Sequence, residues 1–65
     1  MDNAAKAILE LLRSVDEPLT TQEIVRKLRL PRHIVSYRLQ QLAIEGRIKG
    51  KLTKNRGAWI WWYKK

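Results

Sequence analysis

Hydrophobic positions recur with a helical period in the first part of the chain. The apolar side chains of this run lie on one side of a helix: Ala4, Ala5, Ala7, Ile8, Leu11, Leu12 and Val15. Asp2 or Asn3 is available as the N-cap, and Pro18 blocks continuation of a helix past the preceding acidic residues. The pattern predicts a first helix that ends before Asp16.

A second helix is marked by its start signal. Thr20 is followed three residues later by Glu23, which is the spacing of a capping box, and Leu19 and Ile24 are spaced as a hydrophobic staple. The helix is expected to be short, presenting Ile24, Val25 and Leu28 to a core. The chain then turns at Arg29-Leu30-Pro31.

A third helix is predicted to begin at Pro31, because proline suits the first position of a helix. Its apolar stripe consists of Val35, Leu39 and Leu42 with the stem of Arg38. The opposite side carries His33, Tyr37, Gln40 and Ile44, flanked by Ser36 and Gln41, with Arg32 in the first turn. Gly46 is the expected residue just past the end of this helix.

After Gly46 the period of the pattern changes from 3.6 to 2. In the run 47–52, basic residues alternate with Ile48, Gly50 and Leu52, and an aromatic run follows at 58–63. The segment between them, Thr53-Lys54-Asn55-Arg56-Gly57, has the residues of a hairpin loop. We therefore expect two strands that form a basic hairpin.

Three helices followed by a two-stranded β-hairpin, with a tight turn between the second and third helices, define a small α+β domain of the winged helix-turn-helix type. A chain of 65 residues has room for a single domain, spanning residues 1–65. It contains no cysteine, which excludes disulfides and thiolate metal sites. The fold must therefore be stabilised by packing.

The net charge of +8 is unevenly distributed along the chain. Two basic residues accompany five acidic ones before position 26, whereas twelve basic residues and only Glu45 follow from Arg26 onward. Basic surface confined to one part of a small domain favours a polyanionic partner, because each neutralised phosphate releases counterions. The alternative is a merely solubilising surface. The concentration of charge favours nucleic acid.

The pattern divides the candidate DNA contacts into two sets. The residues expected to face a duplex groove are on the third helix: Arg32, His33, Ser36, Tyr37 and Gln40. The residues expected to hold the backbone or minor groove are near the turn and on the hairpin: Arg26, Lys27, Arg29, Lys49, Lys51, Lys54 and Arg56. The alternative for Tyr37 is packing against the second helix.

The third helix also resembles a family pattern. The run from Val35-Ser36 through Leu39, Leu42, Gly46 and Ile48 is similar to the recognition helix of bacterial and archaeal winged-helix transcription regulators. Nearly the whole chain resembles small fimbrial-operon regulators of the PapI and FaeA kind, through Tyr37, Glu45-Gly46 and Arg56-Gly57 followed by Trp62. The resemblance implies a sequence-specific regulator that binds double-stranded DNA, alone, as a homodimer or with a larger DNA-binding protein.

A weaker resemblance is to Z-alpha domains, which recognise left-handed duplexes. The chain shares Pro31-Arg32, Val35, Leu39, Leu42 and Glu45-Gly46 with their pattern. The asparagine and tyrosine that the family uses for recognition would lie at Ser36 and Gln40, where this chain departs from it.

The aromatic run at 58–63 places large apolar side chains on both faces of a strand. Alternation sends Trp59, Trp61 and Tyr63 to one face and Ile60 and Trp62 to the other. The fimbrial-regulator resemblance implies that Trp62 packs inward with Ile48, Leu52 and Ile60, leaving Trp59 and Trp61 partly exposed. These two would then pack on the first helix, stack on single-stranded bases, or form a partner surface with Ile44.

Other classes of function are disfavoured. The chain has one histidine, no glycine-rich phosphate loop and no paired carboxylates, so we expect no enzyme, no cofactor, no metal and no small-molecule effector. Charged residues interrupt the only apolar stretch near the N-terminus, so we expect no membrane association and a cytoplasmic location, nucleoid-associated if the protein is prokaryotic. A protein-interaction module and a single-stranded or Z-form nucleic-acid binder are the alternatives to duplex DNA binding.

Overall fold

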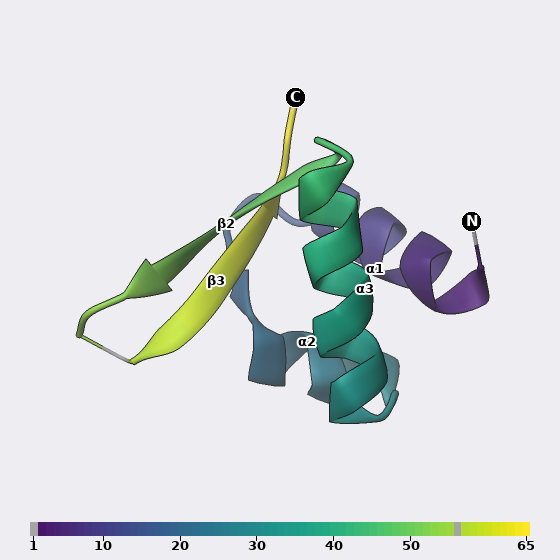
Figure 1. Ribbon diagram of the computed structural model, residues 1–65, viewed down its shortest axis with the longest axis horizontal. Coiled ribbons are helices and arrows are strands. Elements are labelled where there is room, and N and C mark those ends of the chain that lie inside the picture. The colour runs from purple at the N-terminus through teal and green to yellow at the C-terminus, as the bar shows by residue number, and fades with distance from the viewer. Residues whose placement is uncertain (1, 56) are drawn as a thin grey trace.

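Helices and strands follow one another in a winged-helix order. The computed structural model describes residues 2–55 and 57–65. The elements in this part of the chain are α1 (Asn3–Ser14), β1 (Leu19–Thr20), α2 (Thr21–Leu28), α3 (Arg32–Ile44), β2 (Ile48–Thr53) and β3 (Ala58–Tyr63). The three helices gather on one side, and the far halves of β2 and β3 project beyond them (Figure 1). We call β2, β3 and the loop between them the wing.

The first two helices begin at the predicted caps. Asp2 Oδ1 accepts a hydrogen bond of 2.8 Å from the Ala5 amide. At α2, Thr20 Oγ1 accepts from the Glu23 amide at 3.1 Å, and Glu23 Oε1 accepts from the Thr20 amide at 2.8 Å, which completes the capping box. Each bond satisfies an amide that the helix itself leaves without a partner.

The turn between α2 and α3 depends on an unusual backbone conformation at Arg29. This residue has a φ of 54°, in the left-handed region, and its amide donates to the Val25 carbonyl at 2.8 Å. Pro31 is the N-cap of α3, and its carbonyl accepts from the Val35 amide at 3.1 Å. At the other end of α3, Gly46 has a φ of 79°, which confirms it as the terminating glycine.

The sheet has one strand more than the sequence pattern predicted. Its order is β1-β3-β2, with β1 pairing antiparallel to β3 so that Leu19 lies opposite Trp61 and Thr20 opposite Ile60. The expectation of a two-stranded sheet was therefore incomplete. The residues that lead into α2 are extended because Thr20 is an N-cap, and this extended segment occupies the edge of β3 that β2 leaves open.

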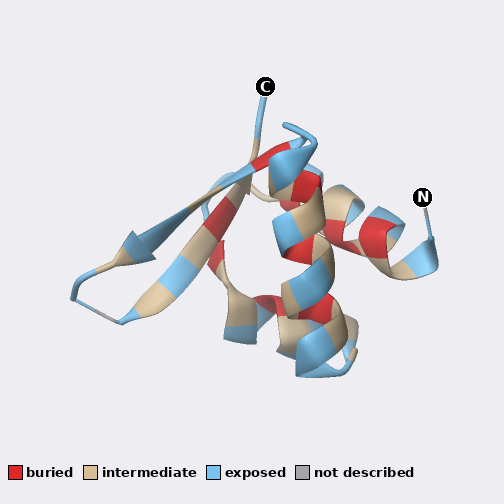
Figure 2. Cartoon of the chain, in the orientation of Figure 1, coloured by how far each residue is buried: buried red, intermediate tan, exposed pale blue. Residues whose placement is uncertain are grey.

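The core lies between the helices and the inner face of the sheet. Its most buried side chains come from every helix and from all three strands: Ala5, Ile8, Leu12, Leu19, Ile24, Val35, Leu39, Leu42, Ile48 and Trp61. Figure 2 shows buried positions on both α1 and α3, and on α3 these are Val35, Leu39 and Leu42. The predicted stripe of α3 is thus confirmed.

The register of the hairpin decides which tryptophan belongs to the core. Gly50 pairs with Trp61, so the Trp61 ring lies over the glycine, where an added Cβ would overlap it. Trp61 is only 6% exposed, and its indole N–H donates to Thr21 Oγ1 at 2.9 Å. The expected inward packing of Trp62 with Ile48 was therefore wrong.

Leu52 also differs from the expectation. It shares the inner face with Ile48 but is 53% exposed, because it lies on the part of the wing that extends beyond the helices. A position on the inner face of the hairpin is therefore buried only where a helix packs over it.

Candidate nucleic-acid interface

The outer side of α3 presents a polar surface to solvent. The groove-facing residues predicted on this helix are exposed, except for Ser36, which is half-buried: Arg32, His33, Ser36, Tyr37 and Gln40. Tyr37 is 55% exposed and does not take the alternative position in the core against α2. The apolar stripe on the inner side holds the helix against the core, so these side chains are presented on a rigid element.

Tyr37 is held in place by its neighbours on α3. Gln41 Nε2 donates to the Tyr37 hydroxyl oxygen at 3.0 Å, and the Arg38 guanidinium carbon lies 4.9 Å from the Tyr37 ring centroid. Arg38 in turn donates to Gln41 Oε1 at 2.9 Å and forms an ion pair with Asp2. The tyrosine oxygen accepts from Gln41, and its O–H can still donate, which suits a phosphate oxygen.

A groove separates α3 from the wing. Its volume is about 490 Å³, and it is lined by residues of β1, α2, α3 and the wing: Thr20, Thr21, Gln22, Arg32, Ser36, Gln40, Gly57, Ala58, Trp59 and Trp61. Three of the predicted contact residues of α3 thus share one groove. Arg32 Nη1 donates to Gln22 Oε1 at 2.7 Å, so the guanidinium is held beside the groove. The sequence pattern gave no indication of Gln22.

The wing side of this groove is lined by two stacked aromatic rings. The Trp59 and Trp61 rings lie 5.4 Å apart between centroids and are inclined by 21°. Trp59 remains 47% exposed, whereas Trp61 is core, so the expectation of a partly exposed Trp61 was wrong. The partner surface suggested by the sequence is reduced to Trp59 and to Ile44, which is 85% exposed at the end of α3.

The loop of the wing is closed by two hydrogen bonds. The Gly57 amide donates to the Thr53 carbonyl at 2.9 Å, and Thr53 Oγ1 donates to the Ala58 carbonyl at 2.7 Å. Lys54 is exposed in this loop, at the end of the wing farthest from the helices. Arg56, the preferred wing contact in the sequence interpretation, lies outside the described residues.

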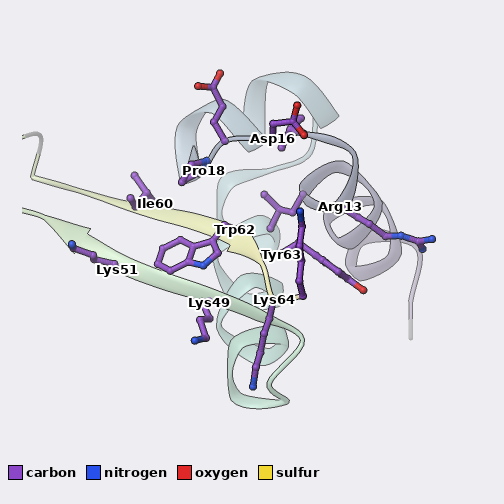
Figure 3. Close-up of a pocket in the computed structure, with 13 residues that line it drawn as sticks. Arg13, Asp16, Pro18, Lys49, Lys51, Ile60, Trp62, Tyr63 and Lys64 are labelled. Carbon is purple, nitrogen blue, oxygen red and sulfur yellow. The ribbon is translucent and has the colours of Figure 1, made fainter.

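The remaining basic residues are divided between two parts of the surface. Arg26, Lys27 and Arg29 are exposed on α2 and in the turn before α3. Lys49 and Lys51 pair with Trp62 and Ile60 and project from the outer face of the sheet, away from the core (Figure 3). The structure therefore does not bring these two lysines to the groove that holds Arg32.

Two other features of the described residues bear on function. Across residues 2–55 and 57–65, no three His, Asp or Glu side chains gather in a way that suits a metal ion. Within the same residues, no helix has the length and apolar character needed to cross a membrane.

Comparison with known proteins identifies a structural relative. A solved structure from work on the DNA-recognition and protein-interaction domains of HOP2, and on its homologous DNA pairing properties, superimposes with a TM-score of 0.86 at 29% sequence identity. The match covers 95% of this chain and 100% of the other. No family model and no curated protein matches the chain. The likeness supports the winged-helix fold, and the resemblance to fimbrial regulators stays a prediction.

Proposed function

We propose that this domain binds duplex DNA, with α3 in the major groove and the wing against the backbone or the adjacent minor groove. The observation that carries the proposal is the shared groove, in which Arg32, Ser36 and Gln40 of α3 face Trp59 of the wing. The likeness to a structure from work on DNA recognition by HOP2 supports the same conclusion.

The chemistry of the exposed residues suits a duplex. An α-helix fits the major groove, where an arginine such as Arg32 can donate to guanine O6 and N7 and a glutamine such as Gln40 can pair with adenine N6 and N7. The hydroxyl groups of Ser36 and Tyr37 suit phosphate oxygens, which fix the orientation of the protein on the duplex. Lys54 on the wing and the exposed cations of α2 provide further phosphate contacts.

The first test is binding of the protein to a labelled 20-base-pair duplex of random sequence, measured by fluorescence anisotropy over a range of salt concentrations. Affinity should fall steeply with salt, because each phosphate contact contributes about 0.9 to the logarithmic slope. Arg32→Ala should weaken binding about tenfold. Lys6→Ala removes an exposed cation from α1 and is the matched control. Absence of binding, or binding that does not depend on salt, contradicts the proposal.

Two finer functions remain to be separated. Sequence-specific regulation of transcription is favoured by the exposed Arg32 and Gln40, which suit base edges. Binding that serves DNA pairing is favoured by the likeness to the HOP2 structure, which comes from work on homologous DNA pairing. The side-chain chemistry favours sequence-specific regulation over DNA pairing.

Selection of bound sequences from a random duplex pool distinguishes these two functions. A regulator should enrich a defined motif, and Gln40→Ala should relax one position of that motif by about 1–3 kcal/mol of discrimination. Binding without an enriched motif would instead support the pairing function.

A further inference from the structure

The outer face of the sheet carries an open pocket that the proposed duplex contacts do not use. It has a volume of about 610 Å³ and lies where this face meets the end of α1 and the segment before β1. Its apolar lining includes Trp62, Ile60, Val15 and Pro18. The pocket is therefore on the opposite face of β3 from Trp61 and the groove beside α3.

Trp62 is the largest side chain in this pocket. It is half-buried. In Figure 3 the face of its indole is turned to the viewer, with Lys49 and Lys51 on the neighbouring strand and Pro18 beyond β3. Lys49 is its direct partner across the sheet, and Lys51 is the partner of Ile60. Directly opposed side chains in an antiparallel pair are close neighbours, so the aromatic surface has cations beside it.

Charge is distributed unequally around the pocket. Lys49, Lys51 and Lys64 line its β2 side and the end of β3, and all three are exposed. Asp16 and Glu17, also exposed, line the opposite side in the segment between α1 and β1, where Arg13 at the end of α1 also lines the pocket and pairs with Glu10. One rim thus carries lysines, whereas on the other rim two carboxylates outnumber the single Arg13.

We propose that this outer face is a second nucleic-acid site, which takes a single strand. An unpaired base stacks on the indole of Trp62 while the phosphates of the strand pass Lys49 and Lys51. Aromatic platforms flanked by cations bind single strands in this way, because every base has a face that can stack.

The unequal rims favour a single strand over a duplex at this face. A duplex laid across the pocket would bring phosphates toward both rims and therefore toward Asp16 and Glu17. A single strand needs only the basic rim for its phosphates, and its bases are free to reach the tryptophan. The domain would then hold a duplex and a single strand on opposite sides of β3.

The test uses the full chain and a fluorescein-labelled oligo-dT of eight nucleotides, measured by fluorescence anisotropy. Trp62→Leu should weaken binding about tenfold, since loss of one stacked base has an effect of this size. Trp59→Leu, on the inner face, is the matched control and should change affinity less than twofold. The double variant Lys49→Gln/Lys51→Gln should lower the salt slope by about 1.4, the value for two phosphate contacts of a single strand.

The lysine variant also carries the test if Trp62→Leu does not fold, because both lysines are exposed. On addition of oligo-dT, the backbone amide signals of Lys49, Lys51 and Trp62 and the indole signal of Trp62 should shift in the NMR spectrum. In a competition experiment, an unlabelled duplex should leave the labelled oligonucleotide bound. This last outcome separates the present proposal from the proposed duplex function, which is measured on its own with Arg32→Ala.

The proposal is overturned if oligo-dT does not bind, or if a duplex displaces it. It is also overturned if Arg32→Ala weakens oligo-dT binding whereas Trp62→Leu and the lysine variant do not. Absence of shifts at Trp62, with shifts there on adding a peptide, would assign the face to a protein partner instead.

Discussion

Trp61 and Trp62 are neighbours in the chain, yet they lie on opposite faces of β3 in different environments. Trp61 is 6% exposed, covers Gly50 and donates its indole N–H to Thr21. Trp62 is half-buried in a pocket that Lys49 also lines. The face of the strand on which each tryptophan lies therefore sets its role: on the core side Gly50 leaves room for the Trp61 ring, whereas on the outer side Lys49 places a charged chain beside Trp62.

Truncating each tryptophan in turn should reveal the largest difference between the two faces. Trp61→Ala should lower the free energy of unfolding by about 3–5 kcal/mol, the usual loss when a core aromatic residue is removed. Trp62→Ala should cost about half as much, since part of its ring is already in water. Urea unfolding followed by far-UV circular dichroism measures both. Equal losses would mean that both faces contribute equally to the core.

Filling the space at Gly50 should disturb the inner face alone. Gly50→Ala places a Cβ inside the Trp61 ring position and should cost about 1–3 kcal/mol of stability, because the ring must move. Lys51→Ala, on the outer face of the same strand, should change stability by less than about 0.5 kcal/mol. Thermal unfolding of the two variants provides the comparison. A stable Gly50→Ala protein would show that Trp61 does not need this space.

Removing the acceptor of the indole N–H tests how Trp61 is oriented. Thr21→Val should cost about 1 kcal/mol, because a largely buried donor loses its partner, and the indole proton resonance of Trp61 should move upfield. Thr21→Ser keeps the hydroxyl group and should preserve the resonance. An unchanged resonance in the valine variant would contradict the hydrogen bond.

Replacing single lysines should have the smallest effect of these changes. It tests which surface of the wing contacts duplex DNA. Lys54→Gln should lower the salt slope of duplex binding by about 0.9, the contribution of one phosphate contact. Lys49 projects from the outer face, so Lys49→Gln should leave duplex binding unchanged. Anisotropy titrations with the same duplex measure both slopes. Equal reductions would place the duplex across both faces.

Helix ends could be predicted from the sequence, whereas β1 and the contact between α2 and α3 could not. Thr20 and Gly46 identified a helix start and a helix end correctly, because capping depends on residues only a few positions apart. Two-residue β1 is too short to show an alternating pattern and was missed. The hydrogen bond between Gln22 and Arg32, which helps to build the candidate site, joins residues on different helices and leaves no mark in either helix pattern.

The helices, the stripe of Val35, Leu39 and Leu42, and the concentration of basic residues after position 25 are all predictable from the order of residues along the chain. Tertiary packing was needed to show that Trp61 belongs to the core, that β1 completes the sheet, and that Lys49 faces away from α3. The physical reason is the range of the interactions. Caps and helical stripes depend on neighbours three or four residues away, whereas an aromatic strand with apolar residues on both faces acquires an inner side only when the helices pack against one of them.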